Sequence, residues 1–373
     1  MAQVFSQGQI AGLQGSAGRA VHAMAGPAHA PGAGKVVVVL RVAKAVLPAV
    51  FLHFCLALCN WLTRRRLKPP GKVIKLSKGE CHYLECSPQV LRQEVGDVSH
   101  SDVPVVLVHG LFGSTLYFRY LQAELSKQRR VFSYDNYGRG FSGAGKGPMN
   151  ASLFVGQLLE LLDHLGLDKV DLVGYSMGGG IATAFAAKHP ERICSLALLA
   201  PCGMPSVGTR VIRIASGLSK FPGAAPILGF YALAVLLIRG DKAYGAGWQL
   251  QMQKDRDRLH ELWTLEARRL VTEWYNLSSA LGRTFKRFPF YSLTKEASEL
   301  GRHCGAGLPI LSVWGELDES VPVAGRAEFL KLVPGLQTQV LRARGHAFPL
   351  EHAEETAATL RTFWQGGEIS ENA

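Results

Sequence analysis

The chain has 373 residues, of which 47% are hydrophobic and 19% are charged. This composition provides enough apolar material for one sizeable α/β core with appendages, and it excludes an intrinsically disordered protein. The formal net charge is +12, but eleven of the 41 basic residues and none of the acidic ones lie in residues 1–79. From Glu80 onward, 30 basic residues are balanced by 29 acidic ones. This remainder lacks the electrostatic footprint of nucleic-acid binding.

Residues 1–35 are rich in Gly and Ala and show neither alternation nor a helical stripe, so we expect a flexible tail. The absence of acidic residues there is compatible with a transit peptide. Arg and Ser are too sparse to favour that interpretation.

Residues 36–68 are predicted to be a membrane anchor with a basic flank. Residues 45–62 form an almost uncharged run, near the short end of the roughly 20 residues that span a bilayer. Because Arg64, Arg65 and Arg66 follow it, the positive-inside rule places the catalytic part of the chain in the cytoplasm. A cleaved secretory signal and a helix lying in the membrane plane are the alternatives. The organelle stays open, with the endoplasmic reticulum among the candidates.

The seven cysteines are scattered along the chain and form no disulfide framework or metal-binding spacing. Cys81 and Cys86 are close enough in sequence to pair. Free thiols are the simpler interpretation, and they favour a reducing compartment.

Short apolar runs predict the buried strands of a mostly parallel sheet, and helix-compatible stretches between them, such as 118–128 and 153–165, predict helices on both faces. The first part of this core is expected at 69–202 and the second at 305–373. The runs are residues 105–108, 131–134, 170–173, 196–199 and 310–314.

Residues 203–304 have a different hydrophobic pattern, with long helical runs and no buried-strand pattern. This predicts a helical cap inserted before the fifth of those strands. Within it, residues 224–238 are apolar on all sides. They could form a buried lid helix, a surface that dips into a membrane, or a second span. A second span is disfavoured because it would separate the residues of the site across the bilayer.

The most informative motif is Gly174-Tyr175-Ser176-Met177-Gly178, which follows an apolar strand-like run and leads into a small-residue helical stretch. This places Ser176 on a sharp strand-to-helix turn. The flanking glycines are needed because side chains there would collide with the neighbouring strand and helix. Such a turn exposes the hydroxyl of Ser176 as a nucleophile.

A serine needs a base to remove its proton and an acid to orient that base. Asp318 follows the strand at 310–314 and is the expected acid, with Glu316 and Glu319 as competitors. His346 follows a strand-like run at 339–341 and is the expected general base. The order Ser, Asp, His supports both assignments.

The oxyanion of a tetrahedral intermediate needs hydrogen-bond donors, and backbone N–H groups supply them most rigidly. The N–H groups of Leu111 and Met177 are the expected donors, because Leu111 lies in the glycine-containing loop after the first buried strand. Phe112 and Tyr175 are expected to contact the substrate. The side chain of His109 is expected to bond the loop backbone rather than act as a base.

These residues, together with the turn at 135–142, resemble the α/β-hydrolase family over residues 100–365. Within it the chain is most similar to membrane-anchored monoacylglycerol lipases and related serine esterases. The resemblance implies the α/β-hydrolase fold with a helical cap. Epoxide hydrolases and haloalkane dehalogenases carry aspartate at the elbow, so Ser176 excludes their mechanism. Hydrolysis is favoured over acyl transfer because no histidine is followed five positions later by aspartate.

The expected activity is hydrolysis of lipid esters, of the monoacylglycerol or lysophospholipid type, at a membrane and without nucleic acid. Action on thioesters, amides or C–C bonds is one alternative, and an inactive membrane-bound scaffold is another. No cofactor or metal motif is present. Asn150 and Asn276 begin glycosylation sequons, which stay idle if the domain faces the cytoplasm. The oligomeric state is open.

Overall fold

The computed structural model describes most of the predicted core and part of the predicted cap. The predicted tail at 1–35, nearly all of the predicted anchor at 36–68 and the stretch 239–273 lie outside the described residues. By internal contacts the chain divides into Met1–Phe51 and Leu52–Ala373, and every element described below belongs to the second unit. The described residues are 51, 54, 55, 58, 69–88, 103–206, 210–238, 274–367 and 369.

The core is an eight-stranded sheet with the strand order β1-β2-β4-β3-β5-β6-β7-β8. Neighbouring strands from β4 to β8 in this order run parallel, whereas β1 and β2 add an antiparallel edge. The fold is therefore the predicted mostly parallel α/β sheet. The strands are β1 (Lys72–Leu76), β2 (Gly79–Cys86), β3 (Val105–Val108), β4 (Val131–Tyr134), β5 (Val170–Tyr175), β6 (Ile193–Leu199), β7 (Ile310–Gly315) and β8 (Gln337–Leu341).

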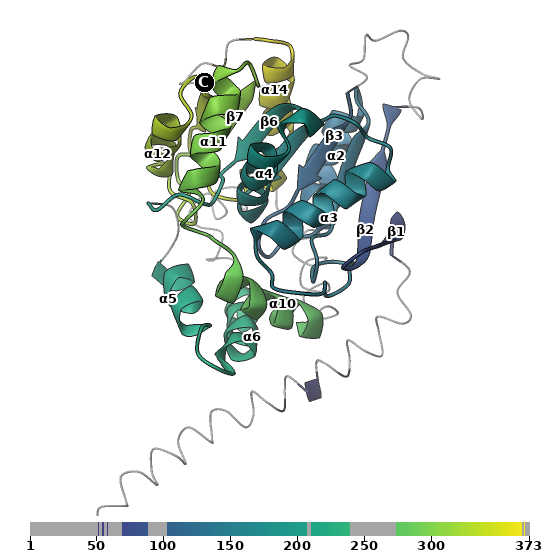
Figure 1. Cartoon of the computed structure of the whole chain (residues 1–373), viewed down its shortest axis with the longest axis vertical. Coiled ribbons are helices and arrows are strands. Elements are labelled where there is room, and N and C mark those ends of the chain that lie inside the picture. The colour runs from purple at the N-terminus through teal and green to yellow at the C-terminus, as the bar shows by residue number, and fades with distance from the viewer. Residues whose placement is uncertain are drawn as a thin grey trace, which may run out of the picture. The chain divides into compact units, whose positions relative to one another are not determined.

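Helices cover both faces of the sheet, and Figure 1 shows α3, α4 and α11 beside one another, with α2 and α14 on the opposite face. The predicted helix at 118–128 corresponds to α2, and a short 3-10 turn precedes it. The helices of the core are η2 (Thr115–Phe118), α2 (Arg119–Ser126), α3 (Ala151–His164), α4 (Met177–Lys188), η3 (Pro190–Arg192), α11 (Thr294–Gly305), α12 (Gly325–Leu332), α13 (Phe348–Glu351) and α14 (Ala353–Trp364).

Within the predicted cap at 203–304, the helices α5 (Arg210–Leu218), α6 (Ala224–Ile238) and α10 (Trp274–Arg287) pack against one another between β6 and β7 in the chain (Figure 1). Helix α11, which begins inside the same predicted range, packs on α4 and α12 of the core instead, so the described part of the cap is α5, α6 and α10. α10 also contacts the loop after β4, because Arg283 donates to the carbonyl oxygens of Ala144, Gly145 and Gly147. Among the described residues, no helix is both long enough and apolar enough to cross a bilayer.

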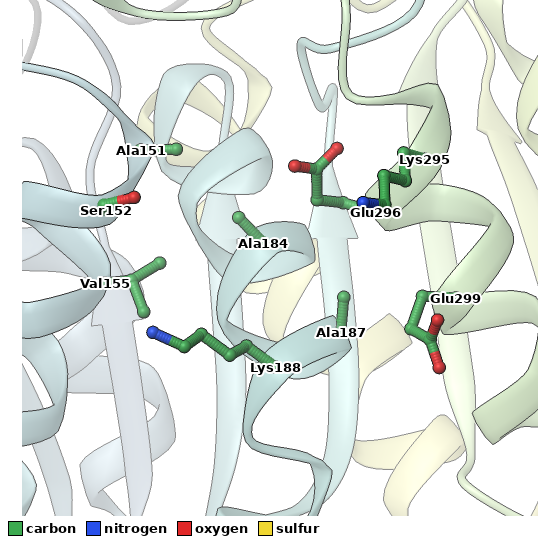
Figure 2. Close-up of a pocket in the computed structure, with 9 residues that line it drawn as sticks. All are labelled: Ala151, Ser152, Val155, Ala184, Ala187, Lys188, Lys295, Glu296 and Glu299. Atoms are coloured by element: carbon green, nitrogen blue, oxygen red, sulfur yellow. The ribbon is translucent and has the colours of Figure 1, made fainter.

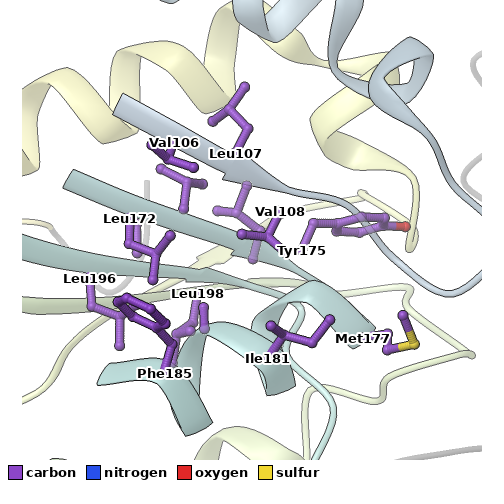
Figure 3. Close-up of a cluster of buried hydrophobic side chains, with 14 of the residues drawn as sticks. Val106, Leu107, Val108, Leu172, Tyr175, Met177, Ile181, Phe185, Leu196 and Leu198 are labelled. Carbon is purple, nitrogen blue, oxygen red and sulfur yellow. The ribbon is translucent and has the colours of Figure 1, made fainter. Parts of the chain in front are cut away.

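The core lies where the central strands meet α4, and Figure 3 shows this cluster. Every residue of β3 is fully buried, and so are the apolar residues of β6 from Leu196 to Leu199. Burying each such side chain contributes roughly 1.5–3 kcal/mol before entropy is subtracted. Strands this apolar place the polar residues that follow them at one well-defined edge of the sheet.

Candidate active site

Ser176 lies on the sharp turn between β5 and α4 and has positive φ, with φ 54° and ψ −116°. Such a conformation is strained for a residue with a side chain. It is held by hydrogen bonds from the Ser176 N–H to the Leu199 oxygen at 2.9 Å and from the Cys202 N–H to the Ser176 oxygen at 3.0 Å. The residues around it are buried, whereas Ser176 itself is half-buried. Ser176 is therefore partly accessible, on a backbone that hydrogen bonds hold in place.

The glycines flanking Ser176 are dictated by close packing. A Cβ on Gly174 would lie 2.5 Å from the Gly178 oxygen and 2.7 Å from the Ala182 Cβ. A Cβ on Gly178 would collide with the Val108 carbonyl in the neighbouring strand. The structure thus agrees with the reason given for these glycines from the sequence.

Ser176, His346 and Asp318 are brought together at this edge of the sheet. The Oγ of Ser176 lies 3.1 Å from Nε2 of His346, and Nδ1 of His346 lies 2.7 Å from Oδ2 of Asp318. The other oxygen of Asp318 accepts from the N–H groups of Ser320 and Val321 at 2.8 Å each. These two bonds fix the carboxylate, and the carboxylate in turn fixes the imidazole with Nε2 toward the serine.

The two competing carboxylates are not part of this chain of hydrogen bonds. Glu316 accepts from the N–H of Ala343 at 2.8 Å and so supports the turn that carries His346. Glu319 is exposed. Of the three acids in this loop, Asp318 is the one that contacts His346.

One expected oxyanion donor, Met177, directly follows Ser176, and the other, Leu111, lies in a loop that approaches it. Met177 is the first residue of α4, so its N–H has no acceptor within the helix. Leu111 follows Gly110, where an added Cβ would lie 3.1 Å from the Cβ of Ser176. The loop that carries Leu111 therefore approaches the nucleophile as closely as a glycine permits. Donation to an oxyanion stays a prediction.

His109 is fully buried and bonds the loop backbone, as expected. Its Nε2 accepts from the N–H of Asn136 at 3.0 Å, so Nδ1 carries the proton and donates to the Gly110 oxygen at 2.8 Å. The histidine ties the loop after β3 to the loop after β4 and lies outside the hydrogen bonds of the Ser–His–Asp group.

Phe112 and Tyr175 have different surroundings. Phe112 is half-buried against the core. Tyr175 is buried, with its hydroxyl 3.1 Å from the backbone oxygen of His346. A substrate contact stays a prediction for both residues.

Arg139 is a residue of the site that sequence reasoning missed, because its Gly-Arg-Gly segment indicated only a turn. The guanidinium is fully buried and donates to three neutral oxygens, those of Leu111 at 3.2 Å, Tyr137 at 3.0 Å and Thr284 at 2.9 Å. Since Thr284 lies on α10, this one side chain connects the cap to the loop that carries Leu111.

His82 and Asp135 form a buried pair, in which Nδ1 of His82 lies 2.7 Å from Oδ2 of Asp135. Burial raises the pKa of Asp135, but the hydrogen bond and the charge of His82, with the hydrogen bond from the Thr115 N–H, outweigh it and lower that pKa below its ordinary value. Asp135 therefore stays ionised. It anchors the start of η2 and, through the N–H of Phe141, the turn around Arg139.

In the part of the chain that the structure describes, no group of three or more His, Cys, Asp or Glu side chains could hold a metal ion. One cavity of about 300 Å³ lies between α3, α4 and α11, and Figure 2 shows its lining. It includes Lys188 at the last turn of α4, whereas Ser176 precedes the first turn. This cavity is therefore separate from the Ser–His–Asp group. It is lined by Ala151, Ser152, Val155, Ala184, Ala187, Lys188, Lys295, Glu296 and Glu299.

Comparison with known proteins agrees with the fold. Residues 103–221 match the family model described as the alpha/beta hydrolase fold. The chain is 29% identical over 258 residues to a putative 2-succinyl-6-hydroxy-2,4-cyclohexadiene-1-carboxylate synthase of Bacillus subtilis, covering 66% of this chain and 85% of that one. It is 25% identical over 271 residues to the 2-hydroxymuconate semialdehyde hydrolase of Pseudomonas sp., covering 71% and 88%.

Among solved structures, the enol-lactonase from Burkholderia xenovorans LB400 superposes with a TM-score of 0.62 at 21% identity, covering 79% of this chain and all of that one. At this identity the likeness shows the fold alone. None of these relatives is named as a monoacylglycerol lipase, so the predicted subfamily is not supported. The family match, the sheet and its helices show that the chain has the α/β-hydrolase fold, and they support a hydrolase of the α/β-hydrolase family.

Proposed function

We propose that the protein is a serine hydrolase that cleaves carboxylic esters of lipids, of the monoacylglycerol or lysophospholipid type, through an acyl-enzyme on Ser176. The observation that carries this proposal is the unbroken chain of hydrogen bonds from Asp318 through His346 to Ser176, on a turn with positive φ. This arrangement can make a neutral hydroxyl nucleophilic near neutral pH.

In the proposed reaction, the Oγ of Ser176 attacks the ester carbonyl while Nε2 of His346 takes its proton. Asp318 stays ionised and stabilises the imidazolium. The carbonyl oxygen becomes an oxyanion, for which the N–H groups of Leu111 and Met177 are the proposed donors. The alcohol leaves with the proton from His346, and a water molecule activated by the same histidine then hydrolyses the acyl-enzyme.

The cap supports a lipid as substrate. Large apolar side chains are exposed on and between α5 and α6, among them Phe221 at 64%, Ile227 at 69% and Tyr231 at 65%. The sequence of residues 203–240 contains basic residues and no acidic one. Exposed apolar side chains among basic residues suit an interface with acyl chains and anionic headgroups. The predicted anchor at 36–68 and a cytoplasmic catalytic domain complete the proposal, with membrane and lipid as partners.

The semialdehyde hydrolase among the relatives favours a second candidate, hydrolysis of a C–C bond beside a carbonyl. Both candidates use the same Ser–His–Asp group, so the substrate separates them. The test is a panel of monoacylglycerols, lysophospholipids, short esters, thioesters, amides and dienoic semialdehydes, run with the wild type and Ser176→Ala. Turnover of long-chain esters that Ser176→Ala abolishes supports the first candidate. Turnover of the semialdehydes alone supports the second.

An inactive scaffold is the remaining alternative. A fluorophosphonate probe reacts with activated serines, so the wild type should be labelled and Ser176→Ala should not. Absence of labelling in the folded wild type, beside a labelled control hydrolase, would rule out the proposed function.

A further inference from the structure

Tyr175 occupies a position from which it holds His346 rather than the substrate. It is buried at the end of β5, and its hydroxyl donates to the backbone oxygen of His346 at 3.1 Å. The hydroxyl of Tyr117, on η2, donates to the Tyr175 hydroxyl at 2.8 Å. Figure 3 shows Tyr175 at the edge of the buried cluster, with its hydroxyl directed away from the aliphatic side chains.

The aromatic rings of Tyr117, Tyr175 and His346 also lie next to one another. The Tyr117 and Tyr175 rings stack with centroids 4.7 Å apart and an interplanar angle of 15°. The Tyr175 and His346 rings lie 5.1 Å apart at 38°. Tyr175 also lies against the loop that carries Leu111, because a Cβ on Gly110 would lie 3.2 Å from its ring. The phenol is therefore enclosed by η2, the loop after β3 and the turn that carries His346.

Resting on the function proposed above, we propose that Tyr175, supported by Tyr117, is a positioning residue for His346 in the acyl-transfer steps. Its hydroxyl fixes the backbone of the histidine, and its ring packs beside the imidazole that takes the proton of Ser176.

Two physical effects underlie this role. A hydrogen bond to the backbone oxygen of His346 restrains the turn so that Nε2 stays near the serine, and loss of such alignment can reduce a rate by up to about 100-fold. The ring of Tyr175, whose centroid lies 5.1 Å from that of the imidazole, also limits the movement of the imidazole. Loss of either contact should lower the rate at every pH.

This role differs from the substrate contact predicted from the sequence. A substrate contact would change KM, and the change would grow with the acyl chain. A positioning residue changes kcat and the rate of labelling by a small fluorophosphonate, and it leaves KM nearly constant.

The test compares Tyr175→Phe, Tyr117→Phe and Tyr175→Leu in the full-length protein. The matched control is Tyr134→Phe, because the buried hydroxyl of Tyr134 has no hydrogen-bond partner among the described residues. Labelling rate, kcat and KM are measured across pH, and thermal unfolding verifies that each variant is folded.

Tyr175→Phe should lower the labelling rate and kcat by roughly 10- to 100-fold, with KM within about twofold and the pH midpoint unchanged. Tyr117→Phe should act in the same direction by a few-fold. Tyr175→Leu should lower both rates at least as much, because the ring packed beside His346 is lost together with the hydroxyl. Tyr134→Phe should match the wild type.

Labelling of Tyr175→Phe at the wild-type rate would overturn the inference while leaving the proposed function in place. A loss confined to KM and dependent on chain length would do the same in favour of substrate binding. If Tyr175→Phe does not fold, Tyr117→Phe decides alone, and a rate equal to that of Tyr134→Phe overturns the inference. A folded wild type that is neither labelled nor active contradicts the proposed function and the inference together.

Discussion

The turn that carries Ser176 leaves no space for a side chain at Gly178. A methyl group there would collide with the carbonyl of Val108 on β3, which cannot move without breaking the sheet. We expect Gly178→Ala to destabilise the protein by about 1–3 kcal/mol or more and to abolish labelling of Ser176. Denaturant unfolding and fluorophosphonate labelling measure the two effects.

Gly156→Ala on α3 is the matched control, because a Cβ there meets nothing within 4 Å. In a helix interior this change should stabilise by up to about 1 kcal/mol and leave labelling intact. Similar losses in both variants would mean that the elbow is not as tightly packed as the structure shows.

Glu351, at the end of α13, is a buried carboxyl whose two oxygens have no hydrogen-bond partner among the described residues. Burial raises its pKa from 4.5 to about 7, against the opposing charge of Arg344. Since the folded state binds this proton more tightly than the unfolded state, its stabilising effect is full below pH 4.5 and is lost as pH rises through about 7.

We therefore expect Glu351→Gln to match the wild type in stability near pH 4.5 and to exceed it above pH 7, by on the order of 1–3 kcal/mol. Thermal unfolding of both proteins between these pH values measures the difference. Glu354→Gln, at an exposed position three residues later, should retain the wild-type pH dependence. A difference between Glu351→Gln and the wild type that does not vary with pH would contradict the assignment.

At the scale of elements, two glycines allow the cap helices α6 and α10 to pack in close contact. A Cβ on Gly229 of α6 would collide with the Ser278 oxygen, and a Cβ on Gly282 of α10 would collide with the Ala225 oxygen. Gly282→Ala should therefore separate α6 from α10 and cost roughly 1–3 kcal/mol within the cap. We expect faster proteolysis in the cap and slower turnover of long-chain esters, with labelling of Ser176 by a small probe retained.

Gly217→Ala on α5 serves as the control for that change, because a Cβ there meets nothing within 4 Å. It should leave both proteolysis and chain-length preference unchanged. Equal proteolysis of Gly282→Ala and Gly217→Ala would argue against close packing of α6 on α10.

Strands β3 to β7 could be predicted because each contains an apolar run buried on both faces, whereas β8 is mostly polar and only its last three residues could be recognised. Strands β1 and β2 could not, since they form the antiparallel edge of the sheet and mix charged residues with buried ones such as His82. Nothing in a sequence of the type Gly-Glu-Cys-His-Tyr reveals that its neighbour in space is β4. Edge strands depend on tertiary contacts more than on local pattern.

The Ser–His–Asp group could also be predicted, because each member lies in the segment that follows a strand and the carboxyl ends of parallel strands share one edge. The contacts of Arg139 and Tyr175 could not. Arg139 bonds Thr284, and Tyr175 bonds the backbone of His346. These partners are 145 and 171 positions away. No local spacing encodes such pairs, whereas the motif around Ser176 is complete within a few residues.

At the scale of the whole molecule, the separation of charge along the chain leads to a test of the proposed membrane anchor. The first 79 residues carry eleven basic and no acidic residues around the apolar run at 45–62. If the apolar run is inserted, binding depends on the hydrophobic effect, and salt should not reverse it. If the basic residues alone act, high salt should screen them, because the Debye length falls to about 3 Å at 1 M.

We expect the full-length protein to sediment with membranes and to resist both 1 M salt and alkaline carbonate, with release by detergent. A variant with Arg64, Arg65 and Arg66 changed to Gln should still bind but should lose its fixed orientation, because the positive-inside bias is weakened. Release of the wild type by salt alone would contradict insertion. A glycan on Asn150 or Asn276 would place the catalytic domain on the luminal side, since those sequons are modified only there.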